Sequence, residues 1–159
     1  MWWLYNGLDW QTILSQVDSK PTTFSEIASL SSFHTAIFTG TQDLEHIEYL
    51  VEGLPNVHFH IFAHSYFGGR VQMLDNFKNV SLYPNYTPYQ SQEILSKLDF
   101  YLDINHSAEI DNIISVVYKL SKPVFAFENT SHDKTNRSYI LPSENPEEMV
   151  KGIKQLLGE

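Results

Sequence analysis

From residue 35 onward, short apolar segments alternate with longer segments in which apolar residues recur at helical spacing. We predict strands at 36–39, 57–62, 80–83, 100–104 and 123–127, and a shorter one at 139–141. Strands that alternate with helices in this way are typical of βαβ units and a parallel sheet. Right-handed crossovers then place helices on both faces of the sheet. The pattern therefore predicts an α/β fold, a Rossmann-like three-layer sandwich with a mainly parallel sheet.

The helices are expected between these strands. The helix after the first strand shows its apolar face at Leu44, Ile47, Leu50, Val51 and Leu54, and the helix after the fourth strand at Ile110, Ile113, Ile114 and Val117. Thr87-Pro88 and Asn145-Pro146 place proline at the first helical position, which favours a helix start, and Asn145 is a good N-cap. Ser107 is expected to cap the helix after the fourth strand.

Residues 1–34 are expected to form a helical and aromatic segment that precedes a Rossmann-like domain at 35–159. All three tryptophans of the chain lie within its first ten residues. Two explanations stay open. The aromatic side chains fold back onto the domain, or the chain belongs to a longer polypeptide whose remaining part contacts them.

Composition narrows the classes of function. The formal net charge is −9 and there are only ten lysines and arginines, so the chain lacks the basic face that nucleic acid or an anionic membrane surface requires. There is no cysteine, which excludes a disulfide scaffold, a cysteine-based zinc site and a thiol nucleophile. No apolar run approaches the roughly 20 residues of a membrane span. The first residues lack the basic region of a secretion signal, and we expect a cytoplasmic protein.

Polar residues follow each predicted strand, and the carboxyl ends of parallel strands are where ligands bind in open α/β sheets. Gly40 and Thr41 follow the first strand and are expected at a helix N-terminus, which attracts phosphate. An ordinary capped helix start explains them better. Arg70 follows two glycines after the second strand and could clamp a diphosphate. The alternative is a flexible turn with an exposed arginine.

The turn after the third strand is rich in aromatic and amide groups. Tyr86 and Thr87 could contact a nucleobase, but an ordinary proline-fixed loop explains them slightly better. His58 and His60 lie two residues apart on one strand, and packing or surface roles fit them better than ligand binding.

The turns after the fourth and fifth strands carry the densest chemistry, at Asn105–Glu109 and Glu128–His132. Each combines carboxylate, imidazole, amide and hydroxyl groups, and we expect both to face one crevice. Glu128 ends an apolar strand, where its carboxylate would be partly desolvated and would need a partner. The spacing of His106, Glu109 and His132 matches no zinc motif, so we expect no metal ion. No serine-hydrolase elbow is present either, which argues against a serine hydrolase.

Four phrases carry a family resemblance: Ile37-Phe38-Thr39-Gly40-Thr41, Leu82-Tyr83-Pro84-Asn85, Tyr101-Leu102-Asp103-Ile104-Asn105-His106 and Pro123-Val124-Phe125-Ala126-Phe127-Glu128-Asn129-Thr130. In their order and spacing they resemble the C-terminal, donor-binding half of GT-B fold glycosyltransferases. The likeness is strongest to bacterial enzymes and partner subunits that glycosylate serine-rich adhesins, and it extends over about residues 35 to 158.

This resemblance implies a nucleotide diphosphate sugar, expected to be a UDP-sugar, as a substrate, with no further cofactor. It implies catalytic or sugar-positioning roles for Glu109 and His106. It also implies a set of substrate-binding residues: Gly40, Thr41 and Arg70 near the phosphates, Tyr86 and Thr87 near the base or ribose, and Asn105, Ser107, Glu128, Asn129 and Thr130 around the sugar.

The chain also departs from the pattern of retaining GT-B enzymes. The second acid expected around 115–117 is absent, and so is the usual Arg and Lys pair on the diphosphate. The chain offers one Rossmann-like half, so an N-terminal acceptor half or a partner subunit is expected elsewhere. Two hypotheses follow: a domain that takes part in hexose transfer to a protein or glycan acceptor, and a non-catalytic partner subunit or binding module that recognises the acceptor protein. A nucleotide-binding response-regulator or flavodoxin-like domain is a third, less well matched reading.

Overall fold

A computed structural model describes residues 33–40 and 43–159 of the chain. Its described part contains a six-stranded sheet in the order β3-β2-β1-β4-β5-β6, with every neighbouring pair parallel. The strands are β1 (Phe33–Phe38), β2 (Val57–Ala63), β3 (Val80–Pro84), β4 (Phe100–Asp103), β5 (Val124–Phe127) and β6 (Tyr139–Leu141). The predicted segment 1–34 lies almost entirely outside the described residues, so its boundary stays a prediction.

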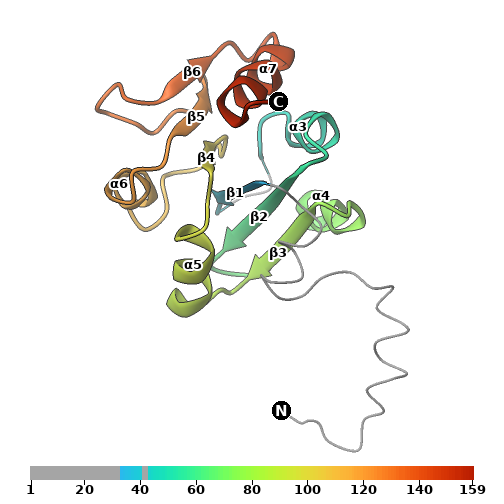
Figure 1. Ribbon diagram of the computed structural model, residues 1–159. Helices are drawn as coiled ribbons and strands as arrows, with labels where there is room; N and C mark the ends of the chain where they lie inside the picture. Colours follow the sequence, from blue (N-terminus) through green and yellow to red (C-terminus); the bar gives the residue numbers. More distant parts are fainter. Residues whose placement is uncertain (1–32, 41–42) are drawn as a thin grey trace, which may run out of the picture. The chain divides into compact units, whose positions relative to one another are not determined.

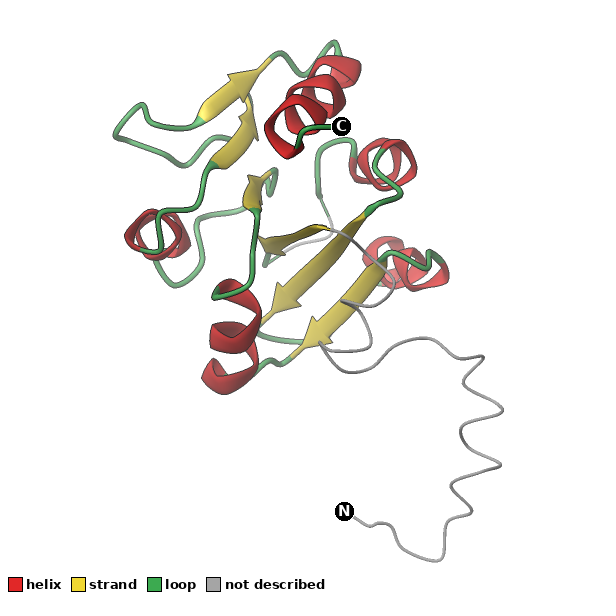
Figure 2. Cartoon of the chain, in the orientation of Figure 1, coloured by secondary structure: helices red, strands yellow, loops and turns green. Residues whose placement is uncertain are grey.

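Helices flank the sheet on both faces, as Figures 1 and 2 show. They are α3 (Ile47–Gly53), α4 (Gly69–Gln72) with the 3₁₀ turn η1 (Met73–Asn76), α5 (Pro88–Leu95), α6 (Ile113–Lys119) and α7 (Pro146–Leu157). Helices α3, α4 and α7 cover one face, whereas α5 and α6 lie on the other. The predicted Rossmann-like three-layer sandwich is therefore confirmed. None of the described helices is long and apolar enough to cross a membrane.

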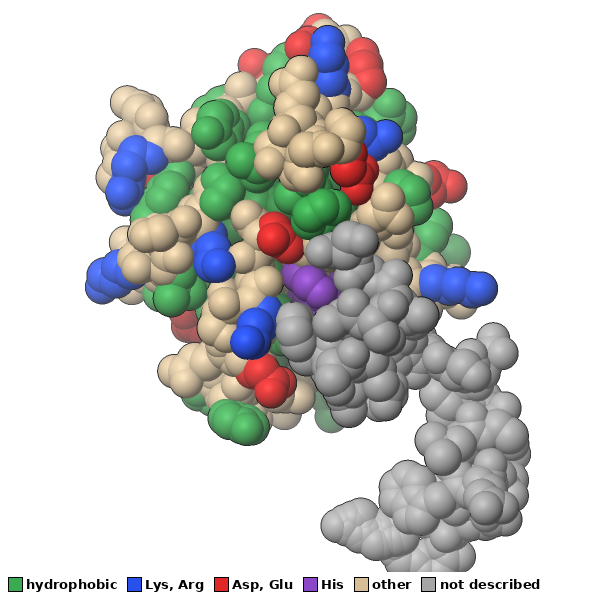
Figure 3. Space-filling model, viewed as in Figure 1, with side chains coloured by type: hydrophobic (Ala, Val, Ile, Leu, Met, Phe, Trp, Pro, Cys, Tyr) green, Lys and Arg blue, Asp and Glu red, His purple; other side chains and the backbone are tan. Residues whose placement is uncertain are grey.

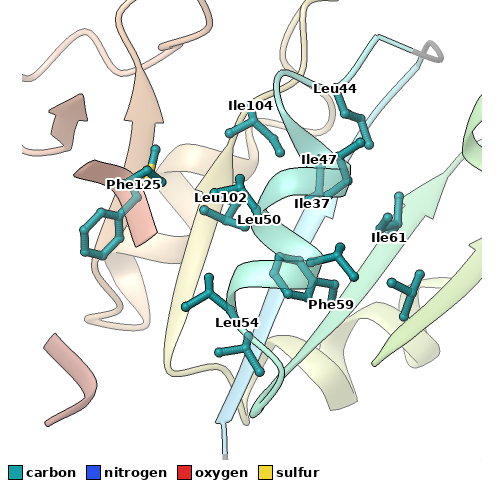
Figure 4. Close-up of a cluster of buried hydrophobic side chains, with 14 of the residues drawn as sticks. Ile37, Leu44, Ile47, Leu50, Leu54, Phe59, Ile61, Leu102, Ile104 and Phe125 are labelled. Atoms are coloured by element: carbon teal, nitrogen blue, oxygen red, sulfur yellow. The ribbon is translucent and has the colours of Figure 1, made fainter. Parts of the chain in front are cut away.

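The larger core lies between the sheet and α3, α4 and α7 (Figure 4). Ile37 of β1, Phe59 of β2 and Leu102 of β4 are completely buried there, together with Leu50 of α3 and Met149 of α7. Each fully buried side chain of this size contributes roughly 1.5–3 kcal/mol to the free energy of unfolding. The strands are apolar along their whole length because helices cover the sheet on both faces.

The opposite face of the sheet carries buried polar groups. His34 of β1 and His58 and His60 of β2 are at most 5% exposed. The ring of His34 hydrogen-bonds that of His60, with 3.1 Å between Nδ1 and Nε2, and His60 in turn bonds the hydroxyl of Tyr83 at 2.8 Å. Of the packing and surface roles expected for His58 and His60, the structure confirms packing.

The helix after β1 begins later than predicted. Leu44 forms an antiparallel bridge with Asn105, and the amide of Glu45 donates to the carbonyl of Ile104 at 2.9 Å. These bonds tether the chain to the end of β4, so α3 starts only at Ile47. The expectation that Gly40 and Thr41 open a helix is wrong for Gly40, while Thr41 lies outside the described residues.

Two other helices, α5 and α7, start at the predicted prolines Pro88 and Pro146. Thr87 caps α5, where its hydroxyl accepts from the amide of Gln90 and the side chain of Gln90 accepts from the amide of Thr87. This reciprocal capping satisfies two amides that the first helical turn leaves open. Helix α7 begins at Pro146 as predicted, although the side chain of Asn145 makes no capping hydrogen bond.

Helix α6 differs from the prediction. Ser107 does not cap it, because its amide and hydroxyl both donate to the side chain of Asn105. The helix instead begins at Ile113 after two residues in left-handed conformation, Asp111 and Asn112. The side chain of Asn112 makes no capping hydrogen bond. Glu109 provides an acceptor at the helix start instead, since its Oε2 accepts from the amide of Ile114 at 2.8 Å.

Candidate functional site

The strand order reverses between β1 and β4, and in an open α/β sheet such a switch point marks the ligand crevice. The two strand ends are linked directly. The hydroxyl of Thr39 donates to Oδ1 of Asn105 at 2.7 Å, and the amide of Gly40 donates to the hydroxyl of Ser107 at 3.4 Å. The structure therefore brings together two turns that lie more than 60 residues apart in the sequence.

Asn105 organises the turn after β4. It is 3% exposed, and its Oδ1 accepts from the Thr39 hydroxyl and from both the amide and the hydroxyl of Ser107. Its amide group donates to the carbonyls of Ser107 and Ala108, each at 3.4 Å. A buried amide with both ends bonded holds its turn in one conformation.

Two adjoining pockets lie at this carboxyl edge. One, of about 450 Å³, is lined by Gly40, Asp43, Ala63, Ser65, Tyr66, Phe67, Gly68 and Arg70. The other, of about 510 Å³, is lined by Asp43, Leu44, Glu45, His46, Glu48, Arg70 and His106. Two charged residues, Arg70 and Asp43, border both.

Arg70 is well exposed and pairs with Asp43, with 3.2 Å between Nη1 and Oδ1. The guanidinium therefore stands between the two pockets with its charge partly balanced by a carboxylate. Figure 3 shows that other lysines and arginines on the visible face are scattered rather than gathered into a patch. Arg70 is the cation of the predicted set that the structure places at the pockets.

Glu45 is a central residue of the edge that the sequence did not single out. Its Oε1 bonds Nε2 of His106 at 3.1 Å, and its Oε2 accepts from Asn129 at 2.7 Å and from the hydroxyl of Ser143. Burial acts to raise the pKa of Glu45, but the hydrogen bonds from Ser143, Asn129 and His106 outweigh it and lower the pKa to about 2. No sequence signal marked Glu45, because it lay within what looked like a helical pattern.

The residues of the turn after β5 differ in how deeply they are buried. Thr130 is buried and bonded within the fold: its hydroxyl donates to the carbonyl of Asp103 at 2.8 Å and accepts from the amide of Phe127. Asn129 is exposed and held by Glu45. The expectation that Glu128 is partly desolvated is wrong, since its side chain turns out to solvent where the strand ends.

The two predicted catalytic residues differ in placement. His106 is at the surface, with 35% of its side chain exposed, and lines the larger pocket. Glu109 is half-buried, anchors the start of α6 and lines neither of the two pockets. Their catalytic roles stay predictions, and the geometry favours His106 as the residue nearer a ligand.

Tyr86 lies beside the end of β1 but is held within the protein. Its ring packs edge-on against Phe38 and Phe62 and stacks on His64. Its hydroxyl donates to Oδ2 of Asp111 at 2.5 Å. Burial, followed by this hydrogen bond and the charge of Asp111, raises the pKa of Tyr86 well above its usual value.

Metal binding has no ready-made site in the part of the chain that the structure describes. No group of three or more histidine and acidic side chains there is placed to hold an ion.

A parallel α/β sheet with polar pockets at the carboxyl edge defines a Rossmann-like domain of the GT-B type, and solved glycosyltransferases are its structural neighbours. The chain belongs to the GftB/GlyA-F C-terminal domain family, whose model matches residues 35–159. It is 50% identical over 159 residues to glycosyltransferase GlyB of Streptococcus pneumoniae, covering 100% of this chain and 39% of that protein.

Other relatives include both enzymes and partners. The UDP-N-acetylglucosamine–peptide N-acetylglucosaminyltransferase stabilizing protein GtfB of Streptococcus agalactiae is 33% identical, over 77% of this chain and 28% of that protein. The crystal structure of GlyE from Streptococcus pneumoniae superposes with a TM-score of 0.75 at 32% identity, over 94% of this chain and 39% of that one.

A further neighbour is a complex. The structure of GtfA/B bound to UDP and GlcNAc superposes with a TM-score of 0.71 at 26% identity, over 78% of this chain and 28% of that one. The chain thus spans well under half the length of the relatives it matches. Family and fold are settled by these likenesses, and the activity of a whole protein is a separate question.

Proposed function

We propose that this chain is the nucleotide-sugar-binding half of a GT-B glycosyltransferase and takes part in hexose transfer to a protein or glycan acceptor. The observation that carries the proposal is the pocket between the ends of β1 and β2. There, Arg70 and Gly40 line one space, next to the strand-order reversal between β1 and β4. A diphosphate fits such a place because its negative charge needs a cation, which Arg70 supplies.

The donor is proposed to be a UDP-sugar. The GtfA/B neighbour was solved with UDP and GlcNAc, and this chain shares its fold. In the proposed complex Arg70 offsets diphosphate charge, so that a metal ion is not required. His106 and the Asn105–Ser107 turn contact the sugar, and Asn129 binds a sugar hydroxyl from the next turn. The acceptor half lies outside this chain, in the same polypeptide or in a partner subunit.

A non-catalytic partner is the second candidate, and one observation favours it. The carboxylate of Glu109 already accepts a hydrogen bond from the amide of Ile114, and residues 115–117 include no second acid. A relative of this chain is a stabilizing protein rather than a transferase. As a non-catalytic partner, the domain would stabilise a separate enzyme and recognise the acceptor protein.

Calorimetry tests donor binding. UDP and UDP-hexoses are titrated into the chain joined to its N-terminal half, with the Arg70→Gln variant in parallel and Lys78→Gln as a matched control on the exposed surface. We expect saturable binding that Arg70→Gln weakens and Lys78→Gln leaves unchanged. Absence of UDP and UDP-sugar binding by the joined protein overturns the proposal.

A transfer assay separates the enzyme from the partner. Glu109→Gln is compared with Glu147→Gln, which changes an exposed acid in the first turn of α7. A large loss of turnover with Glu109→Gln alone supports catalysis by this chain. Unchanged turnover in the full complex, with normal thermal stability, supports the partner role.

A further inference from the structure

Asp103 and His132 form a paired group behind the turn after β4. Asp103 ends β4 with 4% of its side chain exposed, and the side chain of His132 is 20% exposed. Oδ2 of Asp103 accepts from the backbone amide of His132 at 2.5 Å, and Oδ1 lies 2.6 Å from the ring Nδ1. Two contacts therefore fix the imidazole on this carboxylate.

The other ring nitrogen touches the candidate site. Nε2 of His132 lies 2.6 Å from the backbone carbonyl of Ser107. A carbonyl oxygen can only accept, so Nε2 carries a proton. One further proton lies between Nδ1 and Asp103, because neither atom can otherwise bond the other. The two contacts together require the pair to hold two protons, most simply as an imidazolium on a carboxylate.

The surrounding charges agree with this count. Burial acts to lower the pKa of His132, but the hydrogen bond and charge of Asp103, the Ser107 carbonyl and the charge of Glu109 outweigh it and raise the pKa. Burial raises the pKa of Asp103, against the hydrogen bonds from His132, and Glu109 adds to the rise. Burial, followed by the charge of Asp103, raises the pKa of the Tyr101 hydroxyl. The pair is thus built to retain its protons.

We infer that His132 is a positioning residue for the Asn105–Glu109 turn: doubly protonated between Asp103 and the Ser107 carbonyl, it holds the turn in place and releases it on losing a proton. Asn105 holds the same turn from the β1 side through Thr39, so His132 supplies the support from the β5 side. As far as the turn contacts a donor sugar, the inference rests on the proposed function; the protonation and the hold on the turn do not.

The direction of the pH effect follows from the raised pKa. The bond to Ser107 is fully present below the ordinary histidine value of 6.5 and is lost as the pH rises through the higher folded value. The remaining ring proton stays between Nδ1 and the Asp103 carboxylate, the stronger acceptor, so the bare Nε2 then faces the Ser107 carbonyl. The turn therefore loosens on the alkaline side, and ligand affinity at the pocket falls with it.

Nitrogen-detected NMR of the histidine rings in the full 159-residue chain tests the proton count directly. We expect both ring nitrogens of His132 to carry protons at neutral pH, and its titration midpoint to lie above 6.5. The Ser107 amide signal should move with the same midpoint. A His132 ring with one bare nitrogen at neutral pH, or a midpoint at or below 6.5, overturns the inference whether or not nucleotides bind.

Two variants separate positioning from general stability. His132→Gln keeps a donor for the Ser107 carbonyl but does not titrate, whereas His132→Ala removes the donor. We expect the Gln variant to keep the turn ordered with a Ser107 signal that no longer depends on pH up to about pH 9. UDP affinity should fall about tenfold in the Ala variant. Retention of the pH-dependent Ser107 signal in His132→Gln contradicts the inference, and if the Ala variant fails to fold, the Gln variant and the wild-type titration still decide it.

Discussion

The hydroxyl of Thr39 donates a hydrogen bond of 2.7 Å to the side-chain oxygen of Asn105, and this bond joins the ends of β1 and β4 at the strand-order reversal. Both residues are buried, at 0% and 3% exposure. The turn that carries His106 is therefore anchored to the first strand of the domain, and the bond couples the geometry of the candidate pocket to the core.

Replacing Thr39 by valine should weaken ligand binding beyond its effect on folding. We expect the free energy of unfolding to fall by about 1 kcal/mol, the usual net value of one hydrogen bond. Thr35→Val is the matched control, because Thr35 is equally buried and its hydroxyl donates to the carbonyl of Phe100 at 2.9 Å. Urea denaturation should give similar losses for both, and calorimetry should find weaker UDP binding only for Thr39→Val. Equal affinities would argue against the coupling.

The pair formed by Arg70 and Asp43 predicts opposite effects of two substitutions. Arg70→Gln should reduce UDP affinity by about 10- to 100-fold, the value of a charge-assisted hydrogen bond. Asp43→Asn should increase the affinity, because Asp43 competes with the diphosphate for the same guanidinium. Calorimetry at two salt concentrations measures both, and Glu48→Gln in the neighbouring pocket is the control for loss of one negative charge. An unchanged affinity in Asp43→Asn would show that the pair does not compete with the ligand.

Glu45 should stabilise the carboxyl edge in a pH-dependent way. Replacing Glu45 by alanine removes the acceptor of His106, Asn129 and Ser143, which should cost about 1–3 kcal/mol. Its pKa falls from 4.5 to about 2 on folding, so this stability is present above 4.5 and is lost as the pH falls toward 2. Urea denaturation should therefore find the difference between wild type and Glu45→Ala shrinking over that range. A difference that does not change with pH would contradict the assignment.

The buried histidines should make the domain sensitive to mild acid. Burial, followed by the charges of His58 and His34, lowers the pKa of His60 well below 6.5. The unfolded chain binds the proton first, so stability is full above 6.5 and declines below it by about 1.4 kcal/mol per pH unit for such a group. Denaturation experiments should show that the free energy of unfolding of His60→Gln falls less steeply below pH 6.5 than that of the wild type. The same substitution at the exposed His64 should not have this effect. Equal slopes in the two variants would assign the sensitivity elsewhere.

Asp133 should hold the β5–β6 loop closed. Its carboxylate accepts from the backbone amides of Thr135, Arg137 and Ser138 and from the hydroxyl of Tyr118. Burial acts to raise the pKa of Asp133, but hydrogen bonds from the hydroxyls and amides of Thr135 and Ser138 outweigh it and hold the pKa well below the usual value. Limited proteolysis should cleave Asp133→Ala faster within 133–138 at neutral pH, while the exposed Lys134→Ala serves as control. Unchanged cleavage would show that the loop is held by other contacts.

Much of the fold was predictable because local pattern and tertiary environment agree. Ile37-Phe38 and Phe125–Phe127 are apolar on both sides of the strand, which only a doubly covered parallel sheet explains. Thr87-Pro88 marked the start of α5 correctly, since its capping bonds are formed within four residues. Such signals are local, and sequence spacing alone expresses them.

The site was predictable only in part because its bonds join distant segments. Ser107 looked like a helix cap, but its hydroxyl donates to Asn105, whose side chain also accepts from Thr39. Glu109 was expected to position the sugar, and its carboxylate accepts from the amide of Ile114 at the start of α6. Each polar side chain can satisfy several partners, and the fold selects among them by proximity.

By itself the sequence determined the strands and helices, the parallel three-layer class and the edge of the sheet where the polar turns gather. Hydrophobic periodicity carries that information, because burial of a face is needed wherever the pattern occurs. Only the tertiary structure decided that Glu45 joins three loops, that Asp43 partners Arg70 and that His132 bridges Asp103 and Ser107. Those contacts depend on which strand ends become neighbours, and strand order is a property of the folded sheet.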